Sequence, residues 1–303
     1  MDVRTLRADI LLFVTAAIWG FAFVAQRVGM DHVGPLTFNG IRFALGALAL
    51  VPLIMRMERS RARPGPITEP SKLFWGGLLL GVVLFAGASL QQMGLAVPML
   101  KAWGVESSSA GKAGFITGLY VVFVPILGLF FQQKAALGTW VGAALAVAGM
   151  YLLSVTGDLS VAFGDLLVLM SAFFWAGHVL IIGWLSPGMD AVDAVKLSSV
   201  QFAACSVFSM VGAVLTERIA FAGIVAAAVP ILYGGLMSVG VAYTLQVVAQ
   251  RDANASHAAI ILSLEAVFAA VGGWLLLGEV LGFRALIGCG LMLVGMIVSQ
   301  LKS

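Results

Sequence analysis

Three ionisable side chains stand inside long apolar stretches of this sequence: Arg42, His178 and Glu265. Such groups are costly inside a membrane-spanning segment and are functional candidates by default. Glu265 could bind a substrate ammonium group or carry a coupling proton, or it could be a structural partner for another helix. Arg42 could pair with a substrate carboxylate, extend to the outer membrane interface or bind Glu265. His178 could relay a proton, because imidazole titrates near neutral pH, or pack as a neutral ring.

Aromatic and amide side chains accompany these groups. Trp19 and Trp175 occupy matching places in the sequence and could line an apolar pocket for a hydrophobic or aromatic group, or could pack between helices. Neutral amides and tyrosines add polar groups inside the apolar stretches. We expect the substrate-binding residues to come from the following set: Trp19, Phe23, Gln26, Arg42, Gln91, Tyr120, Trp175, His178, Tyr243, Gln246 and Glu265.

Motifs for other chemistry are missing from the sequence. It contains no His-Glu-x-x-His, no Gly-x-Ser-x-Gly and no phosphate-binding Gly-Lys-Ser/Thr. The three histidines, His32, His178 and His257, lack the spacing of metal ligands, and both cysteines, Cys205 and Cys289, stand in apolar runs. The sequence therefore predicts no catalytic residue, no metal site and no cofactor, and it disfavours an enzyme.

The composition is that of a membrane protein. Of the 303 residues, 61% are hydrophobic and 10% are charged, and the mean hydropathy is +1.06. Soluble domains average about 45–50% apolar and about 25% charged residues, so lipid must cover much of this surface. The net charge of +3 fits basic loops beside membrane spans and does not indicate nucleic acid. The expected partners are the bilayer and a small-molecule substrate, and the bundle can be complete as a monomer.

Apolar stretches separated by charged or turn-forming residues predict an all-α integral membrane protein with ten transmembrane helices. Each crossing needs about 20 residues. Lys and Arg number 11 on one side and 5 on the other if the N-terminus is inside, so we expect both termini in the cytoplasm and the protein in the inner membrane. The expected spans are 8–28, 35–55, 73–96, 110–131, 137–156, 164–185, 197–216, 225–249, 255–277 and 281–301.

An internal repeat relates the two halves of the chain. Three sets of matched residues recur in the same order, with offsets of 156, 159 and 146. They predict two five-helix units, residues 1–157 and 158–303. Because five is odd, the second unit must enter the membrane from the opposite side, as in many secondary transporters. The matched sets are Asp9, Ala16 and Trp19 with Asp165, Ala172 and Trp175; 41–44 with 200–203; and Gly142, Gly149 and Met150 with Gly288, Gly295 and Met296.

Three strings carry a family resemblance: SAGKAGFITGLY at 109–120, LEAVF at 264–268 and GWLLLGE at 273–279. They resemble EamA-type transporters of the drug/metabolite transporter superfamily and, within it, the YddG-like amino-acid exporters. The resemblance implies a ten-helix inverted-repeat fold and export of amino acids or related metabolites. The chain departs from the pattern at Gln133, which stands where the equivalent of Glu279 would fall, and at Ala266, where relatives often have proline.

The function expected from these observations is secondary transport of amino acids or related small metabolites by alternating access, through a mainly apolar pocket between the halves. Proton antiport would use Glu265 or His178, whereas facilitated diffusion needs neither. Efflux of drugs or lipophilic cations is an alternative, with Glu265 as the partner of the cation. A membrane enzyme or scaffold would need a polar catalytic cluster or a large exposed loop, and the sequence shows neither.

Overall fold

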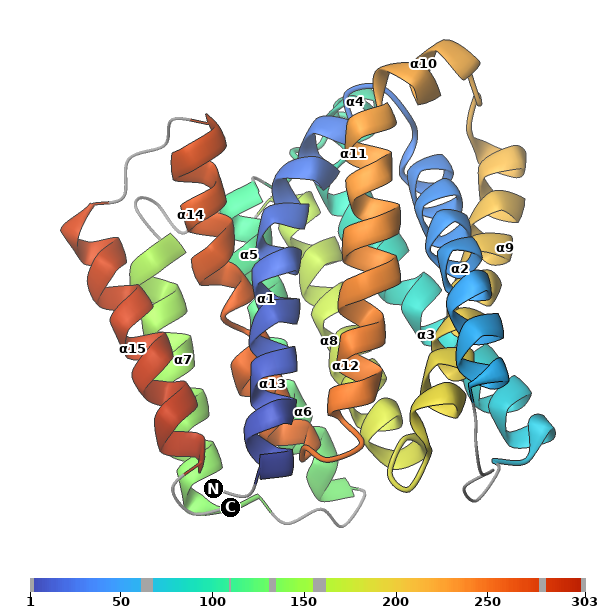
Figure 1. Cartoon of the computed structure of the whole chain (residues 1–303). Helices are drawn as coiled ribbons and strands as arrows, with labels where there is room; N and C mark the ends of the chain where they lie inside the picture. Colours follow the sequence, from blue (N-terminus) through green and yellow to red (C-terminus); the bar gives the residue numbers. More distant parts are fainter. Residues whose placement is uncertain are drawn as a thin grey trace.

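The computed structural model describes residues 3–60, 68–108, 110–130, 135–154, 162–277 and 282–300. Within these ranges the regular structure is entirely helical. The helix α1 begins, and α15 ends, at the same end of the bundle (Figure 1). The helices are α1 (Val3–Gly29), α2 (Pro35–Arg59), α3 (Pro70–Leu95), α4 (Val97–Ala102), α5 (Ala110–Gly118), α6 (Tyr120–Phe130), α7 (Leu137–Ser154), α8 (Phe163–Leu185), α9 (Ala191–Thr216), α10 (Phe221–Ala226), α11 (Ala228–Leu232), the π-helix η1 (Tyr233–Tyr243), α12 (Thr244–Ala249), α13 (Ala255–Leu262), α14 (Glu265–Leu277) and α15 (Phe283–Gln300).

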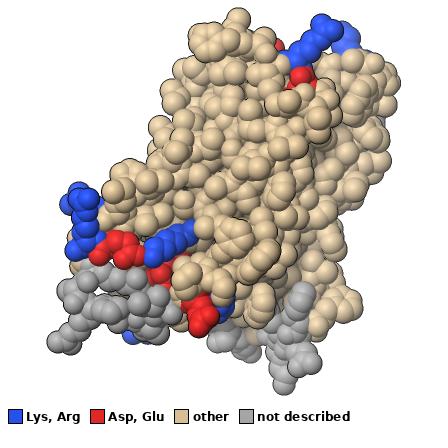
Figure 2. Space-filling model, turned by 90° about the vertical axis from the view of Figure 1, so that its right-hand side faces the viewer, with Lys and Arg blue, Asp and Glu red and all other residues tan. Residues whose placement is uncertain are grey.

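One face of the molecule carries a wide uncharged band. On the face shown in Figure 2, Lys, Arg, Asp and Glu gather near two opposite ends and leave a wide surface of other residues between them. Many large apolar side chains of the described residues are exposed, among them Val211 and Leu215. Exposure of so large an apolar surface to water is unfavourable, whereas its contact with lipid is favourable. The chain is therefore a multi-pass membrane protein.

In the described part of the chain, eight helical segments are long and apolar enough to cross a membrane, and α7 and α15 are shorter apolar helices. Each of the ten expected ranges overlaps at least one helix there, so the helical class is confirmed and the count of ten crossings stays a prediction. The largest difference in boundaries lies at α9, which begins at Ala191, six residues before the expected start of the span at 197, because the Asp190 carboxylate accepts the Asp193 N–H at 2.8 Å and caps the helix there.

Two of the expected spans are interrupted halfway. The helix α5 ends at Gly118 and α6 begins at Tyr120, whereas α13 ends at Leu262 and α14 begins at Glu265. Tight turns with hydrogen bonds three residues apart occupy both breaks. The two breaks are nearly the repeat offset of 146 apart, and each is followed directly by a residue of the expected site.

The expected span 225–249 contains a π-helix. The segment η1 covers eleven residues and is followed by α12. Its carbonyl groups bond to α1: Ala242 accepts from the Thr15 hydroxyl at 3.2 Å, and Ser238 accepts from the Trp19 indole at 3.2 Å. π-Helical turns are often found at functional sites. Here the π-helix ends at Tyr243, which lies in the centre of the bundle.

The helices α2 and α9 are fastened to each other at both ends. At one end the Glu217 carboxylate, which follows α9, accepts the Leu36 and Thr37 N–H groups at 2.7 and 2.8 Å. It thereby caps the start of α2, and it fills the space that a side chain at Gly34 would need. At the other end Lys196 of α9 pairs with Glu58 of α2.

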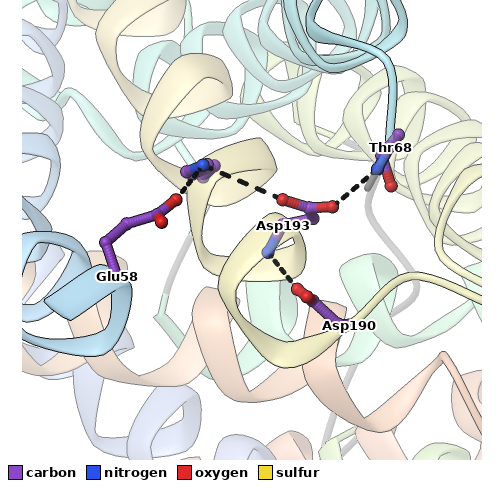
Figure 3. Close-up of polar contacts among 5 residues, drawn as sticks. Glu58, Thr68, Asp190 and Asp193 are labelled. Carbon is purple, nitrogen blue, oxygen red and sulfur yellow. Dashed lines mark hydrogen bonds and ion pairs between the residues drawn. The ribbon is translucent and has the colours of Figure 1, made fainter. Parts of the chain in front are cut away.

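At the end where Glu58 lies, the helix pair α2–α9 also contacts the segment that leads into α3 (Figure 3). Asp193 accepts the Thr68 N–H at 2.9 Å, just before α3 begins, and its carboxylate lies 3.9 Å from the Lys196 ammonium group. The ends of α2, α3 and α9 therefore meet in one polar network at the end of the bundle where α1 begins.

The helices α7 and α15 pack closely through glycines. A Cβ atom added to Gly142 would lie 2.7 Å from the Gly295 carbonyl oxygen, and one added to Gly149 would lie 2.5 Å from that of Gly288. Both distances are below those of real Cβ contacts, so a side chain at either position would force the helices apart. Small residues permit such approaches between membrane helices.

Candidate functional site

A narrow cavity lies in the middle of the bundle, and about 500 Å³ of space, open solvent included, lies between its walls. Its wall comes from α1, α2, α3, the broken pairs α5–α6 and α13–α14, α8 and the η1–α12 segment. All eleven side chains expected to form the site line this cavity. The structure thus brings the whole expected set together, and their role in binding stays a proposal.

Tyr243 is the centre of an aromatic cluster in the cavity wall. Its ring lies 4.5 Å from the Trp19 ring and 6.1 Å from the Trp175 ring, measured between centroids. The rings of Phe43 and Phe202 pack on it at 6.1 and 6.0 Å. The two tryptophans that the repeat relates therefore meet across one tyrosine, and the cavity offers flat apolar surfaces to a ligand.

The indole N–H groups of both tryptophans are already bonded. Trp175 Nε1 donates to Gln91 Oε1 at 2.8 Å, and Gln91 Nε2 donates to Gln26 Oε1 at 3.1 Å. Trp19 donates to the Ser238 carbonyl oxygen. Each bond joins the first half of the chain to the second or extends such a link. Gln91 and Gln26 therefore position the Trp175 ring, whereas the backbone of η1 positions the Trp19 ring.

Arg42 is buried in the cavity wall, with 2% of its surface exposed. Its Nε donates to Asn39 Oδ1 at 3.0 Å, and its guanidinium carbon lies 4.9 Å from the centre of the Phe43 ring. Among the described residues no carboxylate forms an ion pair with it. The cation is held by a neighbouring amide and by aromatic faces, so neither extension to the membrane interface nor an ion pair with Glu265 is observed.

Glu265 is buried at the start of α14, in the broken pair α13–α14. It lies beside the hydroxyl of Tyr120, which begins α6 in the other broken pair. Two further polar atoms of the cavity wall, Thr117 Oγ1 and Gln246 Oε1, lack a hydrogen-bond partner among the described residues. Buried polar groups without partners are rare, and each calls for an explanation such as a bound ligand. Both of these atoms belong to residues that line this one cavity.

His178 lies in the same wall, and one of its ring nitrogens has a hydrogen-bond partner. Its Nε2 atom is 2.8 Å from Gln201 Oε1, and its ring meets the rings of Trp175 and Tyr243 edge-on. The contacts are those of a packed ring that reaches the cavity. His178 therefore packs against other side chains and also lines the cavity.

Four further residues line the cavity and were not expected: Thr117, Val179, Ser238 and Leu262. Thr117 lies inside the 109–120 string, and a hydroxyl there was a signal that could have been used. Val179 and Leu262 are apolar residues in apolar helices and give no such signal. Glu279 and Gln133, which the sequence singled out, lie outside the described residues.

A buried cavity between interrupted helices in a multi-pass bundle is typical of membrane transporters. The profile of the EamA-like transporter family matches residues 6–155 and again residues 162–300. The chain belongs to the EamA-like transporter family. The resemblance to EamA-type transporters that the sequence strings indicated is thus confirmed, and the general activity of the protein is transport.

Individual relatives agree with this assignment. An uncharacterized transporter of Archaeoglobus fulgidus is 29% identical over 99% of this chain and 88% of its own length. A Salmonella typhimurium protein named "Probable amino-acid metabolite efflux pump" is 31% identical over 55% of this chain and 50% of its own length. One solved crystal structure has a TM-score of 0.76 at 15% identity, with 97% of both chains covered, and it shows the same fold.

Proposed function

We propose that the chain exports amino acids or closely related zwitterions, with the substrate carboxylate at Arg42 and its ammonium group at Glu265. The observation that carries the proposal is that both charged side chains line one buried cavity, and no ion pair between them is found in the described part of the chain. A buried charge without a counter-ion is unfavourable. A zwitterion supplies the counter-ion for each, whereas a singly charged substrate supplies only one.

The aromatic cluster would hold the substrate side chain. The rings of Trp19, Trp175 and Tyr243 form an apolar surface in the cavity wall, and they are fixed by hydrogen bonds and mutual packing. Aromatic faces favour apolar and aromatic groups. We therefore expect large neutral amino acids to bind better than small or acidic ones. The name of the Salmonella relative is consistent with this substrate class.

The proposed transport mechanism is alternating access by two inverted five-helix units, residues 1–157 and 158–303. Two family matches and the two matching helix breaks support the division. The glycines of α7 and α15 support it further, because Gly142 meets Gly295 while its counterpart Gly288 meets Gly149. This reciprocal contact is what a two-fold relation between the units would produce.

Flux of a labelled amino acid into proteoliposomes tests the proposal. Liposomes with the purified protein should take up phenylalanine or leucine saturably, and unlabelled substrate should compete. Arg42→Gln and Glu265→Gln should each reduce the flux by tenfold or more, because a fixed partner charge is lost in a buried site. Uptake equal to that of empty liposomes for every amino acid class would refute the substrate assignment.

A second candidate is efflux of lipophilic cations, which one observation favours. Glu265 stands among aromatic residues, and aromatic faces beside a carboxylate are suited to an organic cation. The buried Arg42 in the same wall disfavours a second positive charge. Competition of labelled amino acid flux by a quaternary ammonium compound separates the two, since strong competition would favour the cation reading.

Proton antiport is the coupling that we propose to test first. Glu265 and His178 are the ionisable groups of the cavity wall that can gain or lose a proton, besides the tyrosines. A pH gradient should accelerate uptake in the wild type. Loss of this acceleration in Glu265→Gln, with flux at equal pH retained in part, assigns the proton to that carboxylate; acceleration unchanged in this variant and in His178→Gln would contradict antiport through the cavity.

A further inference from the structure

The side-chain amide of Gln246 presents an oxygen without a partner in the wall of the cavity. Gln246 lies on α12, and 1% of its surface is exposed. It lines the central cavity, and its Oε1 atom has no hydrogen-bond partner among the described residues. A buried amide oxygen without a partner is unfavourable. The oxygen therefore calls for a ligand group that donates a hydrogen bond.

Two hydrogen bonds in series fix which end of the Gln246 amide is free. Gln250 Nε2 donates to the Val179 carbonyl oxygen on α8 at 2.9 Å, and Gln246 Nε2 donates to Gln250 Oε1 at 3.0 Å. A backbone carbonyl oxygen can only accept, so the Gln250 amide cannot be reversed without setting two oxygens against each other. The Gln250 oxygen must then face Gln246 and accept from its nitrogen. The free atom of Gln246 is therefore the oxygen.

The nitrogen of Gln246 is turned toward the packed side of α12. Gln250, its partner, is also 1% exposed, and among the described residues it does not line the cavity, whereas Gln246 does. Gln250 packs closely on α8, since a Cβ atom added to Gly183 would lie 3.6 Å from Gln250 Nε2. The oxygen of Gln246 is thus the polar atom of this side chain that is left for a substrate.

Gln246 lies near the aromatic cluster of the cavity. It follows Tyr243 by three residues, and the amide pair ends on Val179, the residue after His178. The rings of His178 and Tyr243 lie 6.0 Å apart. Glu265, in contrast, comes from α14, which packs mainly against α1 and α5, whereas α12 packs mainly against α1 and α9. The free oxygen therefore belongs to the part of the cavity where the substrate side chain would lie.

We propose that Gln246 makes the transporter select substrates whose side chain carries an uncharged N–H or O–H donor. This inference rests on the proposed function, because it takes an amino acid as the occupant of the cavity. A donor on the side chain supplies the partner that Gln246 Oε1 lacks, whereas an apolar side chain of equal size leaves the oxygen unpaired. Sites built to bond a substrate N–H or O–H reject the analogue without it. Gln250 is the positioning residue that keeps the oxygen turned to the cavity.

Competition by para-substituted phenylalanines against labelled phenylalanine flux tests the proposal. Tyrosine and 4-aminophenylalanine carry a neutral donor at the ring position where 4-fluorophenylalanine, which is of nearly the same size, has none. The two donors should compete about tenfold better than the fluorine compound. Equal or weaker competition by the donors would overturn the proposal. Absence of saturable flux for every amino acid would refute the proposed function and this inference with it, whereas flux without a donor preference refutes the inference alone.

Two substitutions assign the preference to the amide pair. Gln246→Met keeps the length of the side chain but removes the acceptor, so tyrosine should compete no better than 4-fluorophenylalanine, because its hydroxyl would lose water without gaining a partner. Gln250→Met leaves the cavity wall intact but allows the Gln246 amide to turn, and the preference should shrink. A preference unchanged in Gln246→Met would overturn the proposal.

Thr117→Val is the matched control for this ranking. It removes another cavity-wall polar atom that has no partner among the described residues, but one whose hydroxyl can rotate and so can both donate and accept. The donor preference should persist in this variant, and its loss there to the same extent as in Gln246→Met would contradict a specific role of Gln246. The wild-type ranking needs no variant and decides the matter if Gln246→Met does not fold.

Discussion

Single residues decide the charge pattern of the cavity. Arg42 on α2 and Glu265 on α14 line the same cavity from different helices, and no ion pair between them is found in the described part of the chain. Neutral amides around them are bonded mainly to one another and to indole groups. Under the proposed function, the two charged residues would bind the head group of a substrate, whereas the rings would bind its side chain.

The bond between Trp175 and Gln91 gives a prediction at this scale. Trp175→Phe keeps an aromatic ring but removes the donor, so a buried amide oxygen loses its partner at a cost of about 1–3 kcal/mol. We expect a lower melting temperature and weaker substrate binding. Phe173→Leu, which changes an exposed residue of the same helix, is the control and should alter neither; equal effects of both changes would contradict the positioning role.

The expected site residues could be found because membrane interiors make polar groups conspicuous. Arg42, Gln91, His178 and Glu265 stand in apolar stretches, and the cost of burying them marks them in the sequence. What the sequence could not reveal is which polar groups satisfy one another. The bonds from Trp175 to Gln91 and from His178 to Gln201 connect residues 84 and 23 positions apart, and such pairings depend on tertiary packing.

Helices and their pairs form the next scale. The pair α2–α9 is fastened by a carboxylate cap at one end and by an ion-pair network at the other, and the pair α7–α15 is joined through glycines. The presence of the helices could be predicted from hydropathy, since each of the ten expected ranges overlaps helix in the described part of the chain. The breaks at Leu119 and at Ser263–Leu264 could not, because apolar composition continues through them.

The α7–α15 contact predicts a sharp difference between two glycines. Gly142→Ala would place a methyl group 2.7 Å from the Gly295 carbonyl oxygen, whereas Gly290→Ala on α15 meets no atom within 4 Å. We expect the first change to destabilise the fold by about 1–3 kcal/mol. The second should be neutral or stabilising, because alanine favours a helix. Thermal unfolding in detergent measures both, and equal melting temperatures would contradict the close contact.

The cap on α2 predicts a loss on neutralisation of Glu217. Glu217→Gln removes the negative charge that accepts two backbone N–H groups, so we expect a loss of about 1–2 kcal/mol. Asp31→Asn is the matched control, because its exposed pair with Arg27 lies at the same end of the bundle and contributes little. Chemical unfolding should separate the two, and a larger effect of the control would argue against the cap.

The whole molecule is a helical bundle (Figure 1) with an uncharged band on the face shown in Figure 2, and a cavity lies in its middle. Charge asymmetry predicts that α1 begins and α15 ends on the cytoplasmic side. A green fluorescent protein fused after the last residue should therefore fluoresce, and an alkaline phosphatase fusion at the same place should be inactive. The reverse pattern would invert the orientation, and with it the direction assigned to transport.

The central claim is that one cavity recognises both charges of a zwitterion. The most direct measurement compares three competitors of labelled phenylalanine flux that share a phenyl ring: phenylalanine, phenethylamine and 3-phenylpropionate. The account predicts that phenylalanine competes best in the wild type, that Glu265→Gln removes the advantage of an ammonium group and that Arg42→Gln removes the advantage of a carboxylate. Equal competition by all three compounds in the wild type, or the same ranking in both variants, would contradict it.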